Sequence, residues 1–118
     1  MKYLLMLYAN EKVGTKIPPA EMNKFMDKMY AYEATLTKAG VHIANAALQP
    51  TWTAKTINLD DGELKVHDGP YAETKEQFGG YYMIDCPDMD AAVSWAAQCP
   101  AATWGRIEIR PYNEYSRE

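Results

Sequence analysis

The segment from Tyr3 to Tyr8 is apolar at every position, and this feature restricts the fold more than any other part of the sequence. A strand with one face in water alternates apolar and polar side chains, so this run predicts a strand that is buried on both faces. The predicted strand from Gly80 to Asp85 is also largely apolar. A sheet that contains both strands needs a packing layer on each of its sides.

A long amphipathic helix is expected from Ala20 to Ala39, after a loop over residues 14–19. Pro18-Pro19 is typical of a helix start, and Gly40 is typical of a helix end. Apolar residues recur in this segment at steps of three and four, which predicts one stripe that packs on the core. The stripe consists of Met22, Phe25, Met29, Tyr32, Leu36 and Ala39.

The other segments predict short strands and one more helix. Alternating or β-branched runs predict strands over 41–48, 51–59, 63–67 and 106–110, and Asp60-Asp61-Gly62 is a hairpin turn signal. Residues 71–78 are expected to be a loop, with one helical turn starting at Thr74. The second helix is expected to begin after Asp88 as its N-cap and to end before Pro100.

This order predicts one α+β domain over residues 1–118, with a ferredoxin-like split βαββαβ fold and an inserted β-hairpin. Both helices would cover the same face of an antiparallel sheet. The strands around Leu5 and Tyr82 are apolar on both faces, so the second face also needs a cover. The simplest cover is the same face of another copy, which predicts a homodimer.

Charge and composition bear on which partners and which compartment to expect. The net charge is −4 and the pI is about 5.2, and Lys and Arg do not cluster, which argues against nucleic acid and anionic membranes as partners. The apolar N-terminal run is short and lacks a small-x-small cleavage site. We therefore expect a cytoplasmic protein in which Cys86 and Cys99 are free thiols.

The common sequence motifs for cofactors and metals are missing from this chain. The chain contains no dinucleotide-binding glycine motif, P-loop, nucleophile elbow or CxxC. Its two His and two Cys residues do not have metal-ligand spacing. We expect neither a cofactor nor a metal. Gly79-Gly80 is interpreted as a strand entry or a bulge.

The run from Asp68 to Gln77, followed by Gly79-Gly80-Tyr81-Tyr82, resembles the DGPF-domain proteins, a bacterial branch of the YCII-related group. Tyr71 stands where that family usually has Phe. Four further segments match and extend the resemblance over nearly the whole chain: Met1–Leu5, Ala47–Pro50, Ala96–Pro100 and Ile107–Pro111.

The resemblance implies a dimeric α/β barrel, in which two ferredoxin-like sheets close face to face. It also implies a His–Asp pair in a cleft, and hence acid–base chemistry on a small molecule. In those relatives the His lies on the first helix, whereas the helix from Ala20 to Ala39 contains no His, so the pair is not carried over. Some DGPF-type proteins are associated with sigma factors, which implies a regulatory context.

Asp68 is the first candidate for a catalytic residue. It ends a strand and opens a loop, where a carboxylate is placed to act as a general base or to orient a ligand. The alternative is that it accepts backbone N–H groups of the following turn. Tyr71, Glu73, Lys75 and Gln49 are candidates for ligand binding, and solvated loop side chains are the alternative for the charged ones.

His42 is the second candidate, because its imidazole can transfer protons near neutral pH. We expect it on the strand face opposite to Val41 and Ile43, and a structural role is the alternative. The strand neighbours His67 and Asp68 are expected to point to opposite faces. Four aromatic residues are interpreted as a pocket for a flat ligand or as packing anchors: Trp52, Tyr81, Tyr82 and Trp104.

Two functions remain open at this level. The first is a homodimer that binds a small polar or aromatic molecule between sheet and helices, and that catalyses proton transfer or elimination without a cofactor if it is an enzyme. The second is a non-catalytic module that docks a protein partner such as a transcription regulator. A concave pocket with converging polar groups favours the first, and a flat apolar patch outside the dimer interface favours the second.

Overall fold

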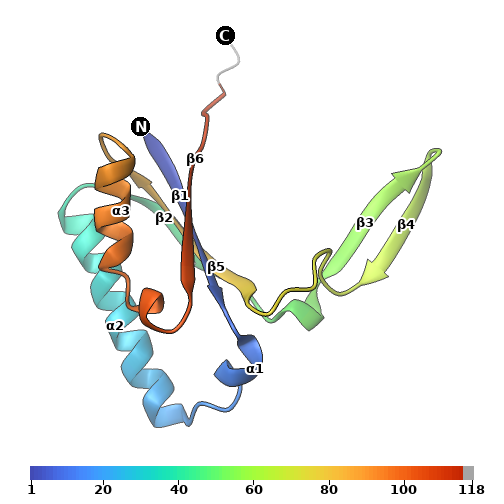
Figure 1. The fold of residues 1–118 in the computed structure, drawn as a ribbon, viewed down its shortest axis with the longest axis horizontal. Helices are drawn as coiled ribbons and strands as arrows, with labels where there is room; N and C mark the ends of the chain where they lie inside the picture. Colours follow the sequence, from blue (N-terminus) through green and yellow to red (C-terminus); the bar gives the residue numbers. More distant parts are fainter. Residues whose placement is uncertain (116–118) are drawn as a thin grey trace.

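A four-stranded antiparallel sheet with two helices on one face forms the body of the protein in the computed structural model, which describes residues 1–115 (Figure 1). The strand order is β2-β5-β1-β6, the ferredoxin-like arrangement, so the predicted α+β fold is confirmed. Its strands are β1 (Lys2–Ala9), β2 (His42–Ala47), β5 (Gln77–Asp85) and β6 (Arg106–Pro111). Its two covering helices are α2 (Pro19–Lys38) and α3 (Met89–Ala97).

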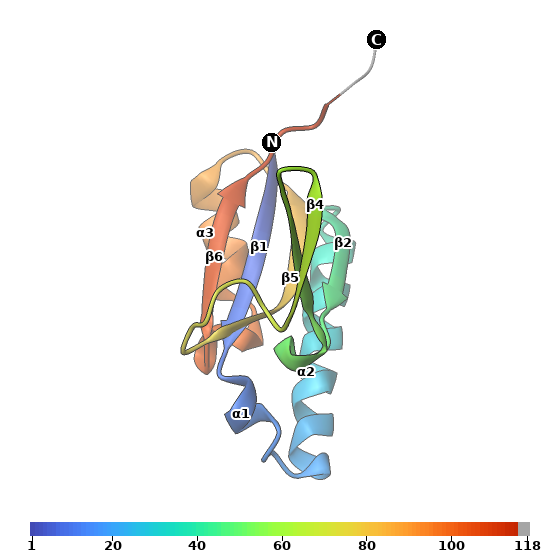
Figure 2. The ribbon, with the colours of Figure 1, turned by 90° about the vertical axis from the view of Figure 1, so that its right-hand side faces the viewer.

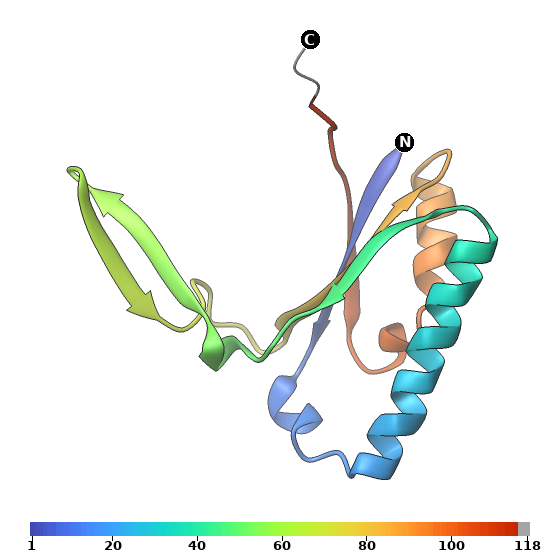
Figure 3. The same cartoon turned by 180° about the vertical axis from the view of Figure 1, so that it is seen from behind.

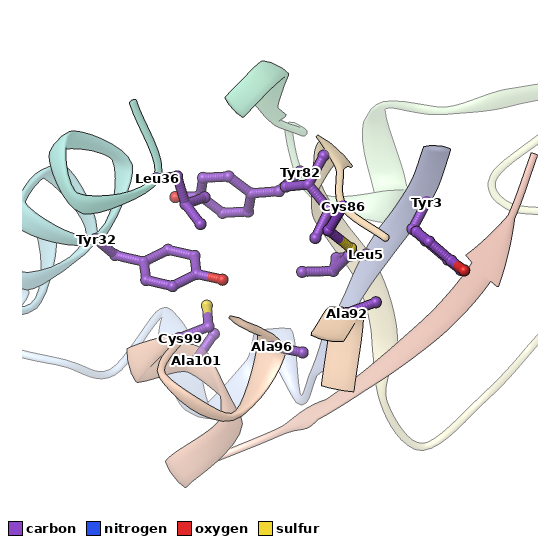
Figure 4. Packing of buried hydrophobic residues seen from close by; sticks show 11 residues of the cluster. Tyr3, Leu5, Tyr32, Leu36, Tyr82, Cys86, Ala92, Ala96, Cys99 and Ala101 are labelled. Atoms are coloured by element: carbon purple, nitrogen blue, oxygen red, sulfur yellow. The ribbon is translucent and has the colours of Figure 1, made fainter. Parts of the chain in front are cut away.

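The core lies between the sheet and the two helices (Figure 4). Tyr3 and Leu5 of β1 are buried there, and Tyr82 of β5 lies beside Leu5 in the strand register. Tyr32 of α2 packs edge-on against Tyr82, with ring centroids 5.2 Å apart. Its hydroxyl donates a hydrogen bond to the Trp95 carbonyl of α3, at 2.8 Å, and so ties the two helices together.

The N-terminal and C-terminal ends of the helices follow the sequence signals. Asp88 caps α3 by accepting a hydrogen bond from the Ala91 amide at 2.9 Å, and Pro19 occupies the first position of α2.

Cys86 and Cys99 are free and buried, and burial raises the pKa of both thiols. Among residues 1–115, no helix is both long enough and apolar enough to cross a membrane.

The opposite face of the sheet carries no layer from the described chain. Leu4 pairs with Met83 and Met6 pairs with Tyr81 on this face, and all four side chains are only partly buried. Figure 2 looks onto this side and shows the strands without helices in front of them. We call it the open face. The expectation that β1 is buried on both sides is thus met on one side only within a single chain.

The inserted hairpin consists of β3 (Lys55–Asp60) and β4 (Glu63–Asp68), which form a separate two-stranded sheet. Asp61 and Gly62 both have positive φ, 49° and 79°, as a two-residue hairpin turn requires. The hairpin projects from the side of the sheet opposite to the helices (Figures 1 and 3). The radius of gyration, 16.5 Å, reflects this projection, since a compact chain of this length has about 13.5 Å.

Several local expectations were wrong. The strand expected from Thr51 begins at Lys55, because Thr51–Thr53 form a 3₁₀ turn, η1, in which the Thr53 amide bonds to the Pro50 carbonyl. Thr74 starts no helical turn, and strand β5 begins at Gln77 rather than at Gly80.

Two short helices were not expected. Asn10 accepts hydrogen bonds from the Lys12 and Val13 amides and so caps α1 (Glu11–Gly14). A second 3₁₀ turn, η2 (Pro100–Thr103), follows α3. The sequence signal for the first was available, since Asn is among the best N-cap residues.

Gly105→Ala should destabilise the fold, because a Cβ at this position would lie 2.0 Å from the Tyr8 carbonyl oxygen of β1. Relieving this contact requires a backbone shift, so we expect the free energy of unfolding to fall by about 1–3 kcal/mol. Urea denaturation measures it. Gly14→Ala is the matched control, since nothing lies within 4 Å of its Cβ. Equal stability of Gly105→Ala and wild type would contradict this packing.

Candidate functional site

A cavity of about 370 Å³ lies between α2 and the helix-covered face of the sheet. Phe25 and Met29 of α2 form one wall, and Leu7, Gly80 and Tyr82 form the sheet wall. At Gly80 a Cβ would lie 3.1 Å from the Ala46 carbonyl oxygen, so the close pairing of β2 and β5 favours glycine here. The remaining lining residues are Tyr8, Ala9, Glu11, Met26, Tyr30, Glu33, Asn45, Ala46, Ala47, Gln77, Gly79, Tyr81, Ala101 and Trp104.

Aromatic rings contribute much of this apolar lining. Trp104, which follows η2, packs edge-on against Phe25 with ring centroids 4.0 Å apart and so joins the end of η2 to α2. Of the four aromatic candidates, Tyr81, Tyr82 and Trp104 line the cavity. Trp52 does not, since it lies on η1 and is 61% exposed. Three of the four thus line a cavity, although Tyr81 contributes from a strand position that points to the open face.

Three polar side chains meet at one end of the cavity. The amide nitrogen of Asn45 lies 3.0 Å from Glu33 Oε1 and 2.8 Å from His42 Nε2. His42 Nε2 lies 3.9 Å from the same Glu33 oxygen. Glu33 and Asn45 line the cavity itself. We refer to Glu33, Asn45 and His42 as the polar triad.

An irregularity in β2 brings His42 and Asn45 together. Residues three apart in a regular strand point to opposite faces. Here His42 pairs with Ile84 and Ala44 pairs with Met83, so Ile43 is an extra residue in β2. Asn45 consequently pairs with Tyr82, and both His42 and Asn45 point to the helix-covered face. A bulge of this kind is a common device for redirecting side chains at functional sites.

The contacts of the triad define its hydrogen-bonding state. The Asn45 amide has two N–H donors, and one is directed at the Glu33 carboxylate, which can only accept while it is ionised. The second donor then meets His42 Nε2, which must act as an acceptor. A neutral imidazole that accepts at Nε2 carries its proton on Nδ1. The geometry thus specifies neutral His42 in its Nδ1–H form.

Tyr82 adds a hydroxyl to the same cavity. Burial, and to a smaller extent the neighbouring Cys99 and Glu33, raise its pKa to about 12. Within residues 1–115 its hydroxyl has no hydrogen-bond partner, yet it is not sealed from solvent. It therefore remains a neutral donor near Glu33, available to a bound molecule.

The polar groups at the other end of the cavity have structural roles. Glu11 accepts hydrogen bonds from the Thr51 amide, at 3.0 Å, and from the Thr51 hydroxyl. The Glu11 amide donates to Gln77 Oε1 at 3.0 Å, and Gln77 Nε2 donates to the Thr74 carbonyl at 2.7 Å. These contacts fasten α1, η1 and the start of β5 together, and they occupy the Glu11 carboxylate.

Asp68 lies away from this cavity, at the base of the hairpin. Its side chain is 86% exposed and pairs with Lys55 Nζ at 2.6 Å, because the register places Lys55 directly opposite. The hydrogen bond and the charge of Lys55 lower the pKa of the Asp68 carboxyl. The alternative, that the Asp68 carboxylate accepts backbone N–H groups of the following turn, was wrong. The Gly69 amide donates to the Ala54 carbonyl, and the Asp68 carboxylate accepts from Lys55.

The other loop candidates do not join the polar triad either. Tyr71 is 90% exposed, and Glu73 and Lys75 are exposed in the same loop. Gln49 lies in a separate groove at the base of the hairpin. The expectation that Asp68, Tyr71, Glu73 and Lys75 face a cleft between sheet and helices of their own chain was therefore wrong. The hairpin carries Asp68 and its following loop to the helix-free side.

Glu33 and Asn45 were missed in the sequence. Glu33 follows Met29 by four residues and Met26 by seven, so a carboxylate next to the apolar stripe of α2 was the available signal. Asn45 gave no signal, because its spacing from His42 places the two on opposite faces of a regular strand. No group of three or more His, Cys, Asp or Glu within residues 1–115 is arranged to hold a metal ion.

The model of the YCII-related domain family matches residues 1–116. The chain belongs to the YCII-related family. This confirms the resemblance stated on its sequence motifs. An uncharacterized protein from Rhizobium meliloti (strain 1021) is a relative of this chain. The two are 36% identical over 117 residues, which cover 98% of this chain and 94% of that protein.

A solved structure shares the YCII-type fold. It is the 5-chloro-2-hydroxyhydroquinone dehydrochlorinase of Burkholderia phenoliruptrix AC1100, in complex with 2,5-dihydroxybenzoquinone. The TM-score is 0.51 at 12% identity, and the match covers 98% of this chain and 96% of that chain. At this identity the similarity establishes the fold alone.

His42 should be observed as the Nδ1–H tautomer, because Asn45 donates to its Nε2. The measurement is the ¹⁵N chemical shifts of the imidazole nitrogens at a pH where the ring is neutral. His67 on the exposed hairpin is an internal control that reports the tautomer ratio of a solvated ring. Asn45→Ala should bring the His42 ratio to that of His67. An Nε2–H form in the wild type would contradict the proposed hydrogen bond.

Stability should fall above pH 10 in part because of Tyr82. Its pKa is about 12 in the folded protein against an ordinary 10.0, so the unfolded chain loses this proton first and unfolding becomes easier as the pH rises between these values. Urea midpoints at pH 8 to 11.5 should therefore decrease less in Tyr82→Phe than in wild type. Tyr71→Phe, which alters an exposed ring, should follow wild type. Identical profiles for Tyr82→Phe and wild type would refute this assignment.

Proposed function

We propose that this protein binds a small, flat, hydroxylated ring compound in the cavity between α2 and the sheet. The observation that carries the proposal is the polar triad at one end of an otherwise mostly apolar cavity. Small-molecule sites usually have volumes of about 300–1,000 Å³, apolar walls and a few converging polar groups. This cavity, at about 370 Å³, has these properties and the size for one ring.

The two ends of such a ligand find different environments. Phe25 and Trp104, packed edge-on, offer aromatic surface to a flat ring. Glu33 Oε2 has no hydrogen-bond partner within residues 1–115, so it is free to accept from a ring hydroxyl. The neutral hydroxyl of Tyr82 supplies a donor for a carbonyl or phenolate oxygen. The dehydrochlorinase with the same fold is complexed with a dihydroxybenzoquinone, which supports this ligand class.

Acid–base catalysis is the reaction type that these groups support. Proton transfer and elimination need groups that take up and release protons at fixed positions. Glu33 is placed to take a proton from a ring hydroxyl, and His42 lies 3.9 Å from its Oε1 across the Asn45 amide. In this proposal Glu33 is the base, and Asn45 and His42 are positioning residues.

The protein is further proposed to work as a homodimer in which two open faces pack together. The partly exposed Leu4, Met6, Tyr81 and Met83 form an apolar surface on the central strands β1 and β5. Removing such a surface from water is favourable, and a contiguous apolar surface of this kind is typical of an interaction site. A second copy offers the same surface, so a two-fold arrangement covers both at once.

Docking of a protein partner was the alternative function. The concave cavity with converging polar groups favours ligand binding over this alternative, since a docking surface needs neither such a cavity nor a hydrogen-bonded triad at its end. Ligand binding is therefore the function that we propose.

Fluorescence of Trp104 tests the proposal directly. Titration with hydroquinone, catechol and 1,2,4-benzenetriol should quench tryptophan emission, whereas cyclohexanol should have little effect because it offers no flat ring. The quench should persist in Trp52→Phe, whose indole lies outside the cavity, and should be lost in Trp104→Phe. If none of the phenols changes the emission, or if Trp104→Phe quenches like wild type, the cavity is not the site.

Glu33→Gln tests the polar end in the same titration. A hydrogen bond to a charged group contributes about 1.5–3 kcal/mol, so the variant should raise Kd for the phenols at least about tenfold. Glu21→Gln is the matched control, since Glu21 is exposed in the first turn of the same helix. An unchanged Kd in Glu33→Gln would remove this carboxylate from the site.

A further inference from the structure

The β3–β4 hairpin has one apolar face that nothing in the described chain covers. The register pairs Ile57 with Val66 and Leu59 with Leu64, and alternation along each strand places these two pairs on the same face. All four are between 51% and 70% exposed. The opposite face carries Thr56, Asn58, Lys65 and His67.

Such a hairpin needs external support. An isolated two-stranded hairpin is at best marginally stable in water, because half of its side chains have nothing to pack against. Lys55 and Asp68 form an ion pair at the base of the apolar face, but both side chains are highly exposed, and such pairs contribute little. The four apolar residues therefore call for a cover from outside the hairpin.

We propose that the hairpin is an arm whose apolar face packs on a second copy of this chain. The proposal rests on the sheet-to-sheet dimer described above. The hairpin projects on the same side as the open face (Figures 1 and 2). A copy that packs on the open face therefore lies alongside the arm, and a single partner covers both apolar surfaces.

The area of these surfaces favours one partner for both. Four strands about 4.8 Å apart and about 20 Å long span a plane of roughly 400 Å². A stable interface buries about 800 Å² on each partner. The open face alone is short of this value, and each arm adds roughly 200 Å² by the same reasoning. In a two-fold dimer each copy buries its own arm and also the surface on which the partner's arm packs. Each copy therefore adds the arm area twice to the area of its open face, and the total approaches that of a stable interface.

The double variant Ile57→Thr/Val66→Thr tests the arm. Threonine keeps the β-branched shape that the strands favour and places a hydroxyl on the apolar face. We expect the dimer dissociation constant, measured by sedimentation equilibrium, to rise about tenfold to hundredfold. The control Asn58→Thr/His67→Thr introduces two threonines on the opposite face, and it should associate like wild type.

Two further measurements separate the possible failures. Met83→Lys alters the open face and should dissociate the dimer by itself. If Met83→Lys dissociates and the arm variant associates as tightly as wild type, the arm proposal is overturned while the sheet dimer stands. A wild type that stays monomeric overturns both, and a tetramer that becomes a dimer in the arm variant overturns the single-partner arrangement. Quenching of Trp104 by phenols reports on the cavity independently.

Hydrogen exchange gives a readout that does not depend on the variants. Amides of residues 55–68 that are hydrogen-bonded across the hairpin should exchange faster when wild type is diluted below its dissociation constant, because the arm then loses its cover and opens more often. Exchange that is equally fast in monomer and dimer would overturn the proposal.

Discussion

The placement of β1 between β5 and β6 is the constraint on which the rest of the structure depends. β1 is hydrogen-bonded on both edges, and its alternating side chains supply both faces of the sheet. Leu5 is completely buried toward the helices, a burial that contributes about 1.5–3 kcal/mol. Leu4 and Met6, on the other face, have no cover within the described chain. One strand thus supplies both the core and the apolar surface that the proposed dimer would cover.

Two departures from regular pairing shape the cavity within this frame. The extra residue in β2 turns His42 and Asn45 to the same face. A second irregularity lies opposite Leu7 and Tyr8, where the register with β5 passes over Gly79. It agrees with the interpretation of Gly79-Gly80 as a bulge, and it lies at the sheet wall of the cavity. Irregularities of this kind bend a strand and increase its local twist.

The cavity and the helix-free side divide the molecule into two functional regions. Glu33, Asn45 and His42 lie on the helix side, between α2 and the sheet. Most of the distinctive run, from Asp68 to Glu76, lies at the base of the hairpin and in the loop that follows it, whereas its last residue, Gln77, lines the cavity. A surface run and an internal cavity need not serve the same purpose. The proposals assign the cavity to a ring compound and the hairpin to a second copy.

The resemblance to the YCII-related group and the pattern of apolar residues led to the same fold by different routes. Periodicity gave α2, because Phe25, Met29 and Tyr32 recur at helical spacing whatever they pack against. The hairpin turn followed from Asp61 and Gly62, which tolerate positive φ. The start of β3 was misplaced, because η1 depends on a contact of Thr51 with Glu11, forty residues away.

The sequence by itself therefore determined the order of the strands and of the two covering helices, the helix-side core and the surplus of apolar surface, since each depends on local spacing and side-chain type. Only the tertiary structure decided which side chains meet. Asn45 reaches His42 through a bulge, and Glu33 reaches both across the space between α2 and β2. Asp68 finds Lys55 because the hairpin register places them opposite each other, away from the cavity. These contacts depend on strand register and on the packing of segments that lie far apart in the sequence. Neither gives a signal in the local sequence.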